Sequence, residues 1–304
     1  MQWSDVAAAY LTPSGDEPPA PAVPDSPSRR LRDAVEPIAT IGWWSQAAGS
    51  EFEGLALDFF GGYVWGRAAS LGAEADVSTV VSAFGVFDAS LVEAVLAAAK
   101  PVVSQEQILQ SRERGAAAGL SAATSSIELP LIASAAHRLR SSMEAVDGAA
   151  RPLFGGLRAL STPTDPHAAL WRAAEMYREH RGDGHLAACV SVGLDQVEMN
   201  VFTELWLGYP AGEYSATRGF PAERINEAVA TLRASGWVDA NGLLTPDGRA
   251  ARDEIEQATD MSQQRIIAAL GDDADALIAD LSMIGDAVIA SQAAPADPRK
   301  RAAG

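Results

Sequence analysis

The run 232–249 constrains the fold more than any other part of the chain. It reads LRASGWVDANGLLTPDGR and joins the end of one amphipathic helix to the start of another. Ser235-Gly236 is a typical helix stop, and Asn241-Gly242 is a strong signal for the turn of a β-hairpin. Thr245-Pro246 then has the composition of a helix start. Between the two helices the run predicts two short strands, 237–239 and 243–245.

The residues before this run predict three helical elements. An amphipathic helix is expected over 195–207, a short helix over 213–218, and a third helix from Pro221 with apolar residues spaced by three and four. Gly219-Phe220 would form the turn between the second and third helices. The order helix, helix, turn, helix, hairpin, helix is that of a winged helix-turn-helix.

The rest of the chain carries helical periodicity and little strand signal, so we expect a mostly all-α protein. Asp165-Pro166 begins one such helix, with Leu170, Trp171, Ala174 and Tyr177 on one face. Six prolines in a polar background at 11–28 predict a disordered segment. The expected division is a disordered tail at 1–30, a helical domain at 31–190, a winged helix-turn-helix domain at 191–270, a C-terminal helix at 271–292 and a disordered tail at 293–304.

Cysteine content and hydropathy indicate the compartment. The single cysteine, Cys189, cannot form an internal disulfide, which fits a reducing environment. The N-terminus has no basic start followed by an apolar run, and no stretch approaches the roughly 18 continuous apolar residues of a membrane helix. We therefore expect a cytoplasmic protein without membrane contact.

The charge pattern bears on DNA binding. In a winged helix that binds DNA, the third helix enters the major groove, and here it offers Arg224, Asn226, Thr231 and Arg233. A DNA reader of this type would act as a homodimer on paired half-sites. However, the chain has a net charge of −17, and residues 195–260 hold five arginines against twelve acidic residues, a balance of −7. This acidity disfavours DNA as a partner, because phosphate contacts need positive charge.

The most unusual polar stretch is REHRGDGH at 178–185, which we expect at a glycine-flanked corner between two helices. Three interpretations remain open. His180, Asp183 and His185 are residue types that bind metals, although their spacing matches no known motif, and we assign no metal. Arg181 and His185 could instead hold an anion, with the backbone N–H groups of the next helix. In the third interpretation, Asp183 caps a helix and Arg181 pairs with a carboxylate.

Two further arginines stand beside glycine as Arg181 does, namely Arg67 and Arg218. Together the three would suit one carboxylate or phosphate ligand shared between domains. Cys189 lies four residues after His185, so a Cys-His pair on one helix face is conceivable, although a lone cysteine among small apolar residues is more often a core residue. The predicted ligand residues are therefore Arg67, His180, Arg181, Asp183, His185 and Arg218.

Several pieces of the sequence resemble an actinobacterial family of helix-turn-helix proteins with a winged, MarR-like C-terminal domain. They are YVWGRAASLG at 63–72, FDASLVEAVL at 87–96, REHRGDGH at 178–185, ATRGF at 216–220 and EIEQATD at 254–260. The resemblance covers roughly 60–270 and implies a fold without a defined activity.

Two functions follow as hypotheses. The first is a ligand-responsive transcriptional regulator. The alternative is a small-molecule-binding protein or enzyme on a winged-helix scaffold that no longer binds DNA, with its pocket at 178–185. The sequence identifies no cofactor and does not decide whether a reaction is catalysed.

Overall fold

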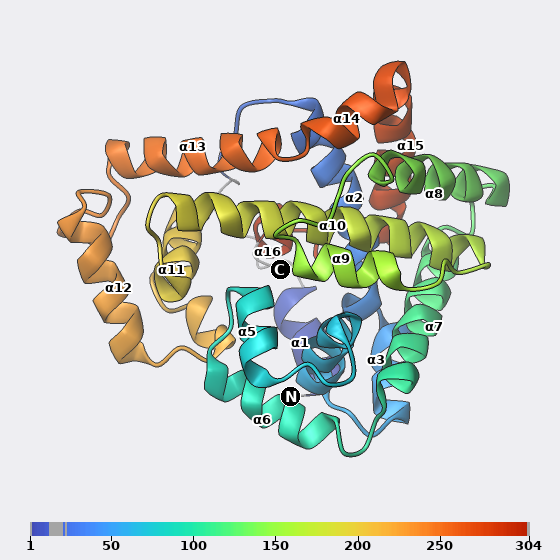
Figure 1. Cartoon of the computed structure of the whole chain (residues 1–304), viewed down its shortest axis with the longest axis horizontal. Helices are drawn as coiled ribbons and strands as arrows, with labels where there is room; N and C mark the ends of the chain where they lie inside the picture. Colours follow the sequence, from blue (N-terminus) through green and yellow to red (C-terminus); the bar gives the residue numbers. More distant parts are fainter. Residues whose placement is uncertain (1, 12–20, 22, 303–304) are drawn as a thin grey trace.

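The computed structural model describes residues 2–11, 21 and 23–302. Figure 1 shows the longest helix, α10 (Pro166–Ser191), crossing the middle of the molecule. The helices that pack against α10 include α2 (Pro27–Trp44) and α13 (Pro246–Met261). These three helices, drawn from the beginning, middle and end of the chain, frame the candidate site.

The remaining elements are also helical. Before α10 lie α1 (Trp3–Tyr10), α3 (Gln46–Gly54), η1 (Gly61–Trp65), α4 (Gly66–Ala68), η2 (Ala69–Leu71), α5 (Val77–Phe84), α6 (Ala89–Ala99), α7 (Gln105–Ala123), α8 (Leu129–Met143) and α9 (Pro152–Ala159). After it lie α11 (Gln196–Trp206), η3 (Ser215–Arg218), α12 (Ala222–Ala234), α14 (Gln264–Leu270), η4 (Gly271–Asp273), α15 (Ala274–Ala290) and α16 (Pro298–Ala302).

Three apolar clusters hold these helices together. The first joins α2, α7, α8, α10 and α15, the second joins α3, η1, α5 and α6, and the third joins α11, α12 and α13. Trp171 lies in the first cluster, where its indole Nε1 donates to the carbonyl of Ala39 at 3.1 Å. All four residues of the predicted stripe on this helix are buried. Burying a large apolar side chain stabilises a fold by about 1.5–3 kcal/mol, so this stripe fixes α10 at the centre.

Local sequence signals set where the helices near the site begin. The carboxylate of Asp165 accepts a hydrogen bond from the backbone N–H of Ala168 at 2.9 Å, which caps α10. Asp195 and Glu198 form a reciprocal capping box at the start of α11. Thr245 Oγ1 accepts from Gly248 N–H at 3.0 Å and caps α13. Each cap satisfies N–H groups that would otherwise lack a partner in the first turn.

The predicted β-hairpin is wrong. The described residues contain no strand, and the segment between α12 and α13 has one antiparallel bridge, between Val238 and Leu244. The Asp239 carboxylate accepts hydrogen bonds from the N–H groups of Asn241 and Leu243 at 2.8 and 2.9 Å, which closes a tight turn. Thr245 then already caps α13, so each arm is too short for a ladder. The fold is therefore all-α, and the wing of the expected winged helix is reduced to a turn.

The helix-turn-helix order itself is present in the third cluster. Figure 1 shows α12 at the edge of the molecule, joined to α11 by a long turn that contains η3. The buried carboxylate of Glu204, on α11, organises this turn by accepting from the N–H groups of Gly212, Tyr214 and Ser215 at 2.6, 2.9 and 2.8 Å. The N–H of Asp88, at the start of α6, donates to the carbonyl of Arg218 at 2.9 Å. The turn before α12 is thus attached to the N-terminal half of the molecule.

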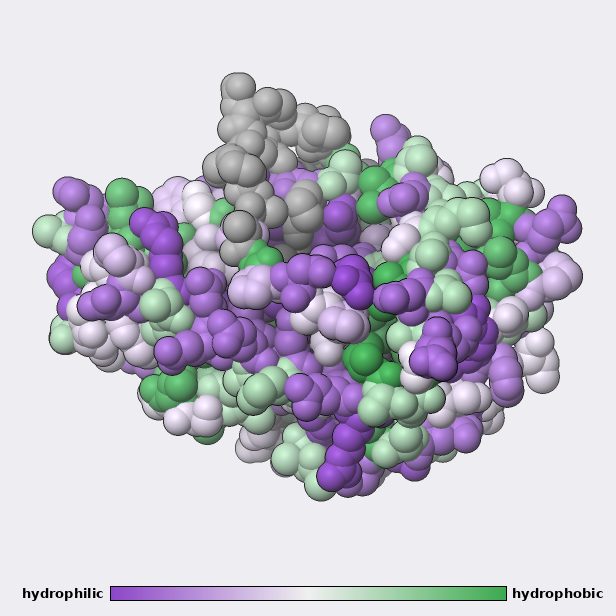
Figure 2. Space-filling model, turned by 90° about the horizontal axis from the view of Figure 1, so that it is seen from above, coloured by the Kyte–Doolittle hydropathy of each residue, from purple (hydrophilic) through white to green (hydrophobic). Residues whose placement is uncertain are grey.

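The two predicted tails are partly described. Residues 1, 12–20 and 22 of the first tail and 303–304 of the second lie outside the described residues. Within the described parts, α1 lies in the first tail and α16 in the second. The C-terminal helix α15 packs along α2. No helix in the described ranges combines the length and apolarity needed to cross a bilayer. On the face seen in Figure 2, hydrophilic residues are interspersed with small hydrophobic patches.

Candidate functional site

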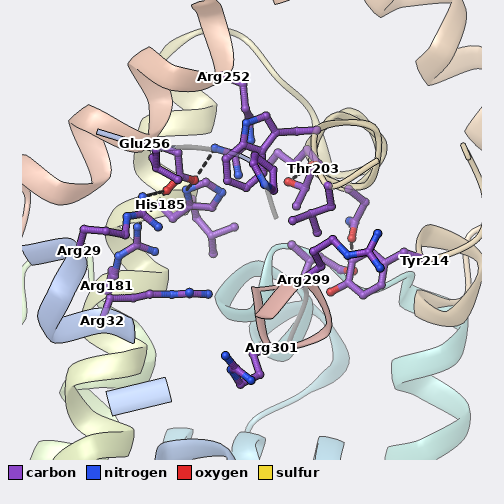
Figure 3. Close-up of a pocket in the computed structure, with 18 of the residues that line it drawn as sticks. Arg29, Arg32, Arg181, His185, Thr203, Tyr214, Arg252, Glu256, Arg299 and Arg301 are labelled. Carbon is purple, nitrogen blue, oxygen red and sulfur yellow. Dashed lines mark hydrogen bonds and ion pairs between the residues drawn. The ribbon is translucent and has the colours of Figure 1, made fainter. Parts of the chain in front are cut away.

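A cavity of about 360 Å³ opens between α2, α10, α11 and α13, and residues of η3 and α16 complete its wall. Figure 3 shows arginines from several of these helices converging on it. Small-molecule sites have volumes of roughly 300–1,000 Å³, so the cavity is of a suitable size. The chain is acidic overall, yet arginine dominates this lining. The charged lining residues are Arg29, Arg32, Asp33, Arg181, Arg218, Arg252, Glu256, Arg299 and Arg301.

Three arginines gather around the carboxylate of Glu256, on α13. Arg29 Nη2 and Arg181 Nη2, the latter at 3.1 Å, donate to one oxygen, and Arg252 Nη1 donates to the other at 2.5 Å. Glu256 is 3% exposed, and burial opposes its ionisation, but the surrounding arginines outweigh burial and hold its pKa well below the ordinary value. The ionised carboxylate therefore ties α13 to both α2 and α10.

Asp260, one turn further along α13, extends this cluster. Arg181 Nη2 donates to Asp260 Oδ1 at 3.2 Å, and Ser26 Oγ donates to Oδ2 at 2.9 Å. The Nε–H groups of Arg29 and Arg181 are buried and have no hydrogen-bond partner within the described ranges. A buried donor left without a partner costs about 1–3 kcal/mol. The Nε–H groups of these two arginines could therefore donate to a further hydrogen-bond acceptor.

The opposite wall of the cavity is formed by α11 and has a different character. It presents Met199, Asn200, Thr203, Trp206 and Leu207, of which Met199 and Leu207 are buried apolar side chains. The guanidinium of Arg252 lies over the Trp206 ring at 4.5 Å from its centroid. The α2 and α10 side of the cavity is thus cationic, whereas the α11 wall combines apolar side chains with the polar Asn200 and Thr203 and with Arg252 over Trp206.

A smaller chamber of about 140 Å³ adjoins the cavity and shares Arg32, Arg181, His185 and Arg218 with it. Arg67 lines this chamber and is held by Glu179 in a two-pronged ion pair, with N···O distances of 3.0 and 2.9 Å. Such a pair is geometrically specific and occupies the arginine. Arg67 is therefore engaged by Glu179 and does not point to a ligand in this structure.

Asp183 also lines the chamber. Its Oδ2 accepts from the N–H of Phe154, in the first turn of α9, at 3.2 Å, and its buried Oδ1 has no partner among the described residues. Burial and the charge of Glu179 raise the pKa of Asp183 to about 7. The helix-capping interpretation of Asp183 holds in an unexpected form, because the helix it caps is α9 and not its own.

The structure brings some of the predicted ligand residues together and separates others. Arg181, His185 and Arg218 line the cavity, whereas Arg67 and Asp183 line only the chamber. His180 lines neither. Its Nδ1 lies 2.8 Å from Gln263 Oε1, its ring packs edge-on against Phe154, and burial lowers its pKa to about 4. His180 is thus a neutral core residue.

The predicted corner at 178–185 is wrong, because α10 continues without interruption from Pro166 to Ser191. A Cβ atom at Gly184 would overlap the side chain of Ser262, which follows α13. The glycine thus permits close packing against the segment after α13 and does not end the helix. Because the helix continues, the backbone N–H groups of this stretch are not available as an anion-binding helix start.

His185 and Cys189 lie side by side on α10, with Cys189 Sγ 3.6 Å from His185 Nε2. Burial and Arg252 lower the pKa of His185 to about 3, and burial raises the pKa of Cys189 to about 11. Both groups are therefore neutral near pH 7, which does not favour a thiolate nucleophile. His185 Nδ1 lies 3.0 Å from Thr259 Oγ1. The described residues contain no group of His, Cys, Asp and Glu side chains arranged to hold a metal ion.

Residues 28–295 match a model described as a helix-turn-helix family. The chain belongs to this helix-turn-helix family. Neither the search of curated proteins nor that of solved structures returned a match. The family match shows neither that the protein comes from an actinobacterium nor that it is of the MarR-like type, as the sequence predicted.

The four predicted DNA-contacting residues of this helix-turn-helix protein are all exposed on α12. Arg224 lies 3.5 Å from Glu227 and 4.0 Å from Asp195, and Arg233 Nε donates to the carbonyl of Asp239 at 3.1 Å. The helix carries two arginines and two glutamates, so its outer face has no net charge. This face is accessible, but it is not a cationic strip.

The lining residues that the sequence did not point to include six charged ones of this helix-turn-helix protein, which lie far apart along the chain. A partial signal existed for four of them, since Arg29-Arg30 and Arg32 stand at the start of a helix and Arg299-Lys300-Arg301 form a basic run near the C-terminus. That run lies in the segment 293–304, which the sequence predicts to be disordered. The missed residues are Arg29, Arg32, Arg252, Glu256, Arg299 and Arg301.

Proposed function

We propose that this helix-turn-helix protein binds a small organic anion in the cavity between α2, α10, α11 and α13. The observation that carries the proposal is the concentration of arginines around one cavity in a chain of net charge −17. Arginine recognises carboxylates and phosphates through planar, two-pronged hydrogen bonds. The proposed ligand residues are Arg181, His185 and Arg218, as the sequence suggested, together with Arg29, Arg32 and Arg301.

The position of the cavity supports a regulatory role. Its walls include α11 and α13, which share the third apolar cluster with α12. An anion that draws Arg29 or Arg181 away from Glu256 would weaken the attachment of α13 to the remaining helices. Ligand binding would in this way change the position or the stability of the helix-turn-helix, which makes the protein ligand-responsive.

Calorimetric titration with inorganic phosphate and with pyrophosphate tests the proposal, alongside native mass spectrometry of the purified protein. We expect saturable binding that Arg32→Gln weakens at least tenfold and that Arg114→Gln, an exposed arginine paired with Glu51, leaves unchanged. No saturable binding of either anion, with no copurified small molecule, would refute the proposal.

DNA binding is the second candidate function, and the exposed outer face of α12 favours it. Fluorescence anisotropy with labelled DNA from upstream of the protein's own gene, against scrambled DNA at several salt concentrations, tests it. Sequence-dependent binding with a steep salt slope would support a regulator, and the predicted homodimer would then be expected on paired half-sites. Equal, weak binding to both DNAs would refute specific DNA binding and leave anion binding as the remaining candidate function.

A further inference from the structure

The lining of the cavity is divided into two halves. Figure 3 shows Arg29, Arg32 and Arg181 together on one side, and Thr203, Tyr214 and Arg299 on the opposite side, where Arg299 pairs with Asp297. The α11 wall also includes the buried apolar side chains of Met199 and Leu207. A purely ionic ligand, such as inorganic phosphate, would use only one half of this lining. The division therefore bears on which kind of anion the cavity fits.

The cationic half offers a binding position for an anion between Arg32 and Arg301, which come from α2 and α16. Arg32 donates to Asp33 at 2.8 Å. Arg301 Nη1 donates to the backbone carbonyls of Pro295 and Ala296, and no described carboxylate lies within ion-pair distance of it. Burial and the like charge of Arg32 lower the pKa of Arg301. An anion placed between the two guanidinium groups would relieve this repulsion.

The charge balance favours an anion with more than one negative charge. Seven arginines line the cavity, and the described carboxylates within ion-pair distance of them are Asp33, Glu256, Asp260 and Asp297, so positive charge is in excess among the described residues. A phosphate monoester carries about −1.5 to −2 near pH 7, so it would offset more of this excess than a monocarboxylate.

The apolar half fits a ligand body with little polarity. Met199 and Leu207 lie on the α11 side, Leu186 comes from α10, and Val86 comes from the segment before α6. Each square ångström of apolar surface removed from water contributes about 25 cal/mol, so an apolar body adds affinity that a bare phosphate lacks. The volume of about 360 Å³ accommodates such a body together with its acidic group.

We infer that the ligand is a phosphate monoester with an aromatic or apolar body, its phosphate between Arg32 and Arg301 and its body against Met199 and Leu207. This inference rests on the proposed function and narrows it to one chemical class. The two halves of the ligand correspond to the two halves of the lining, and neither half alone uses the whole site.

Calorimetric titration of the full chain with inorganic phosphate, methyl phosphate, phenyl phosphate and phenol separates the contributions. We expect phenyl phosphate to bind at least tenfold more tightly than methyl phosphate, and phenol to bind more weakly than either. Arg32→Gln should weaken all three phosphates about equally. Met199→Gln should weaken phenyl phosphate alone, whereas Met261→Gln, at an exposed methionine, should change none.

The outcomes distinguish this inference from the proposed function. If inorganic phosphate binds as tightly as phenyl phosphate, the anion site stands and the apolar body is refuted. If none of the three phosphates binds, the phosphate monoester is refuted, and the proposed function is refuted with it only if pyrophosphate also fails to bind and no small molecule copurifies. The comparison of methyl with phenyl phosphate uses only the unchanged protein, so it decides the inference even if the Met199 variant does not fold.

Discussion

Arg181 on the central helix and Glu256 on α13 form a buried ion pair with an N···O distance of 3.1 Å. This pair connects the helix that follows the helix-turn-helix to the body of the protein. Arg29 and Arg252 donate to the same carboxylate, so one acidic side chain holds three arginines from three different places in the sequence. Glu256 thereby occupies part of the cationic half of the cavity, as a resident anion.

Replacing Glu256 with glutamine should destabilise the fold and sensitise it to added anion. Loss of one partner from a buried ion pair typically costs about 3–5 kcal/mol, because the remaining charges are left uncompensated. We expect urea denaturation of Glu256→Gln to show a loss of this order, partly recovered by millimolar inorganic phosphate. Glu254→Gln, at an exposed position on the same helix, should behave like the wild type. A Glu256 variant as stable as the control would contradict the assigned role.

Two glycines of α10 offer a matched test of helix packing. A Cβ atom at Gly184 would overlap Ser262 and approach Arg151 Nη1 to 3.0 Å, whereas at Gly182 the nearest contact is Glu179 Oε2 at 3.8 Å. We expect Gly184→Ala to lower the free energy of unfolding by about 1–3 kcal/mol through overpacking. Gly182→Ala should raise it by about 0.5–1 kcal/mol, because alanine is the better helix former. Equal effects in thermal denaturation would argue against the close approach at Gly184.

Stability should depend on pH through His185. Its folded-state pKa of about 3 lies below the ordinary 6.5, so the unfolded imidazole takes up a proton first as the pH falls. The contribution of neutral His185 is therefore complete above about pH 6.5 and is lost progressively toward pH 3. At pH 5 the loss is about 1–2 kcal/mol relative to pH 7.5. Denaturation of His185→Gln at the two pH values should show a correspondingly smaller loss than the wild type.

Asp183 should make the stability of the fold depend on pH in the direction opposite to that of His185. Its pKa, raised to about 7, means that folding favours the protonated carboxyl, so its contribution is complete below about pH 3.8 and is lost as the pH rises through 7. Asp183→Asn keeps an acceptor for the Phe154 N–H and removes the buried charge. Relative to the wild type, the free energy of unfolding of the variant should rise by about 1–3 kcal/mol as the pH goes from 5 to 8. A gain that is the same at both pH values, or equally present in the exposed control Asp286→Asn, would refute this assignment.

Much of the local structure could be predicted from the sequence. Asp165-Pro166 and Thr245-Pro246 begin helices where expected, because capping depends on residues within one turn of each other. The hairpin prediction was wrong because it rested on Asn241-Gly242 alone. The carboxylate of Asp239 accepts hydrogen bonds from two N–H groups of the turn, which the prediction did not consider. The corner prediction failed because a glycine can serve packing as well as helix termination, and only the approach of Ser262 distinguishes the two at Gly184.

By itself, the sequence determined the helical character of the chain, the helix-turn-helix order and the interest of Arg181, His185 and Arg218, since each follows from neighbouring residues. Only the tertiary structure decided what surrounds those residues. The cavity joins Arg32 to Arg301 and Arg29 to Glu256 across most of the length of the chain, and helical periodicity carries no information about such distances. The physical reason is that helix formation is local, whereas the burial and pairing of charge depend on which helices pack together.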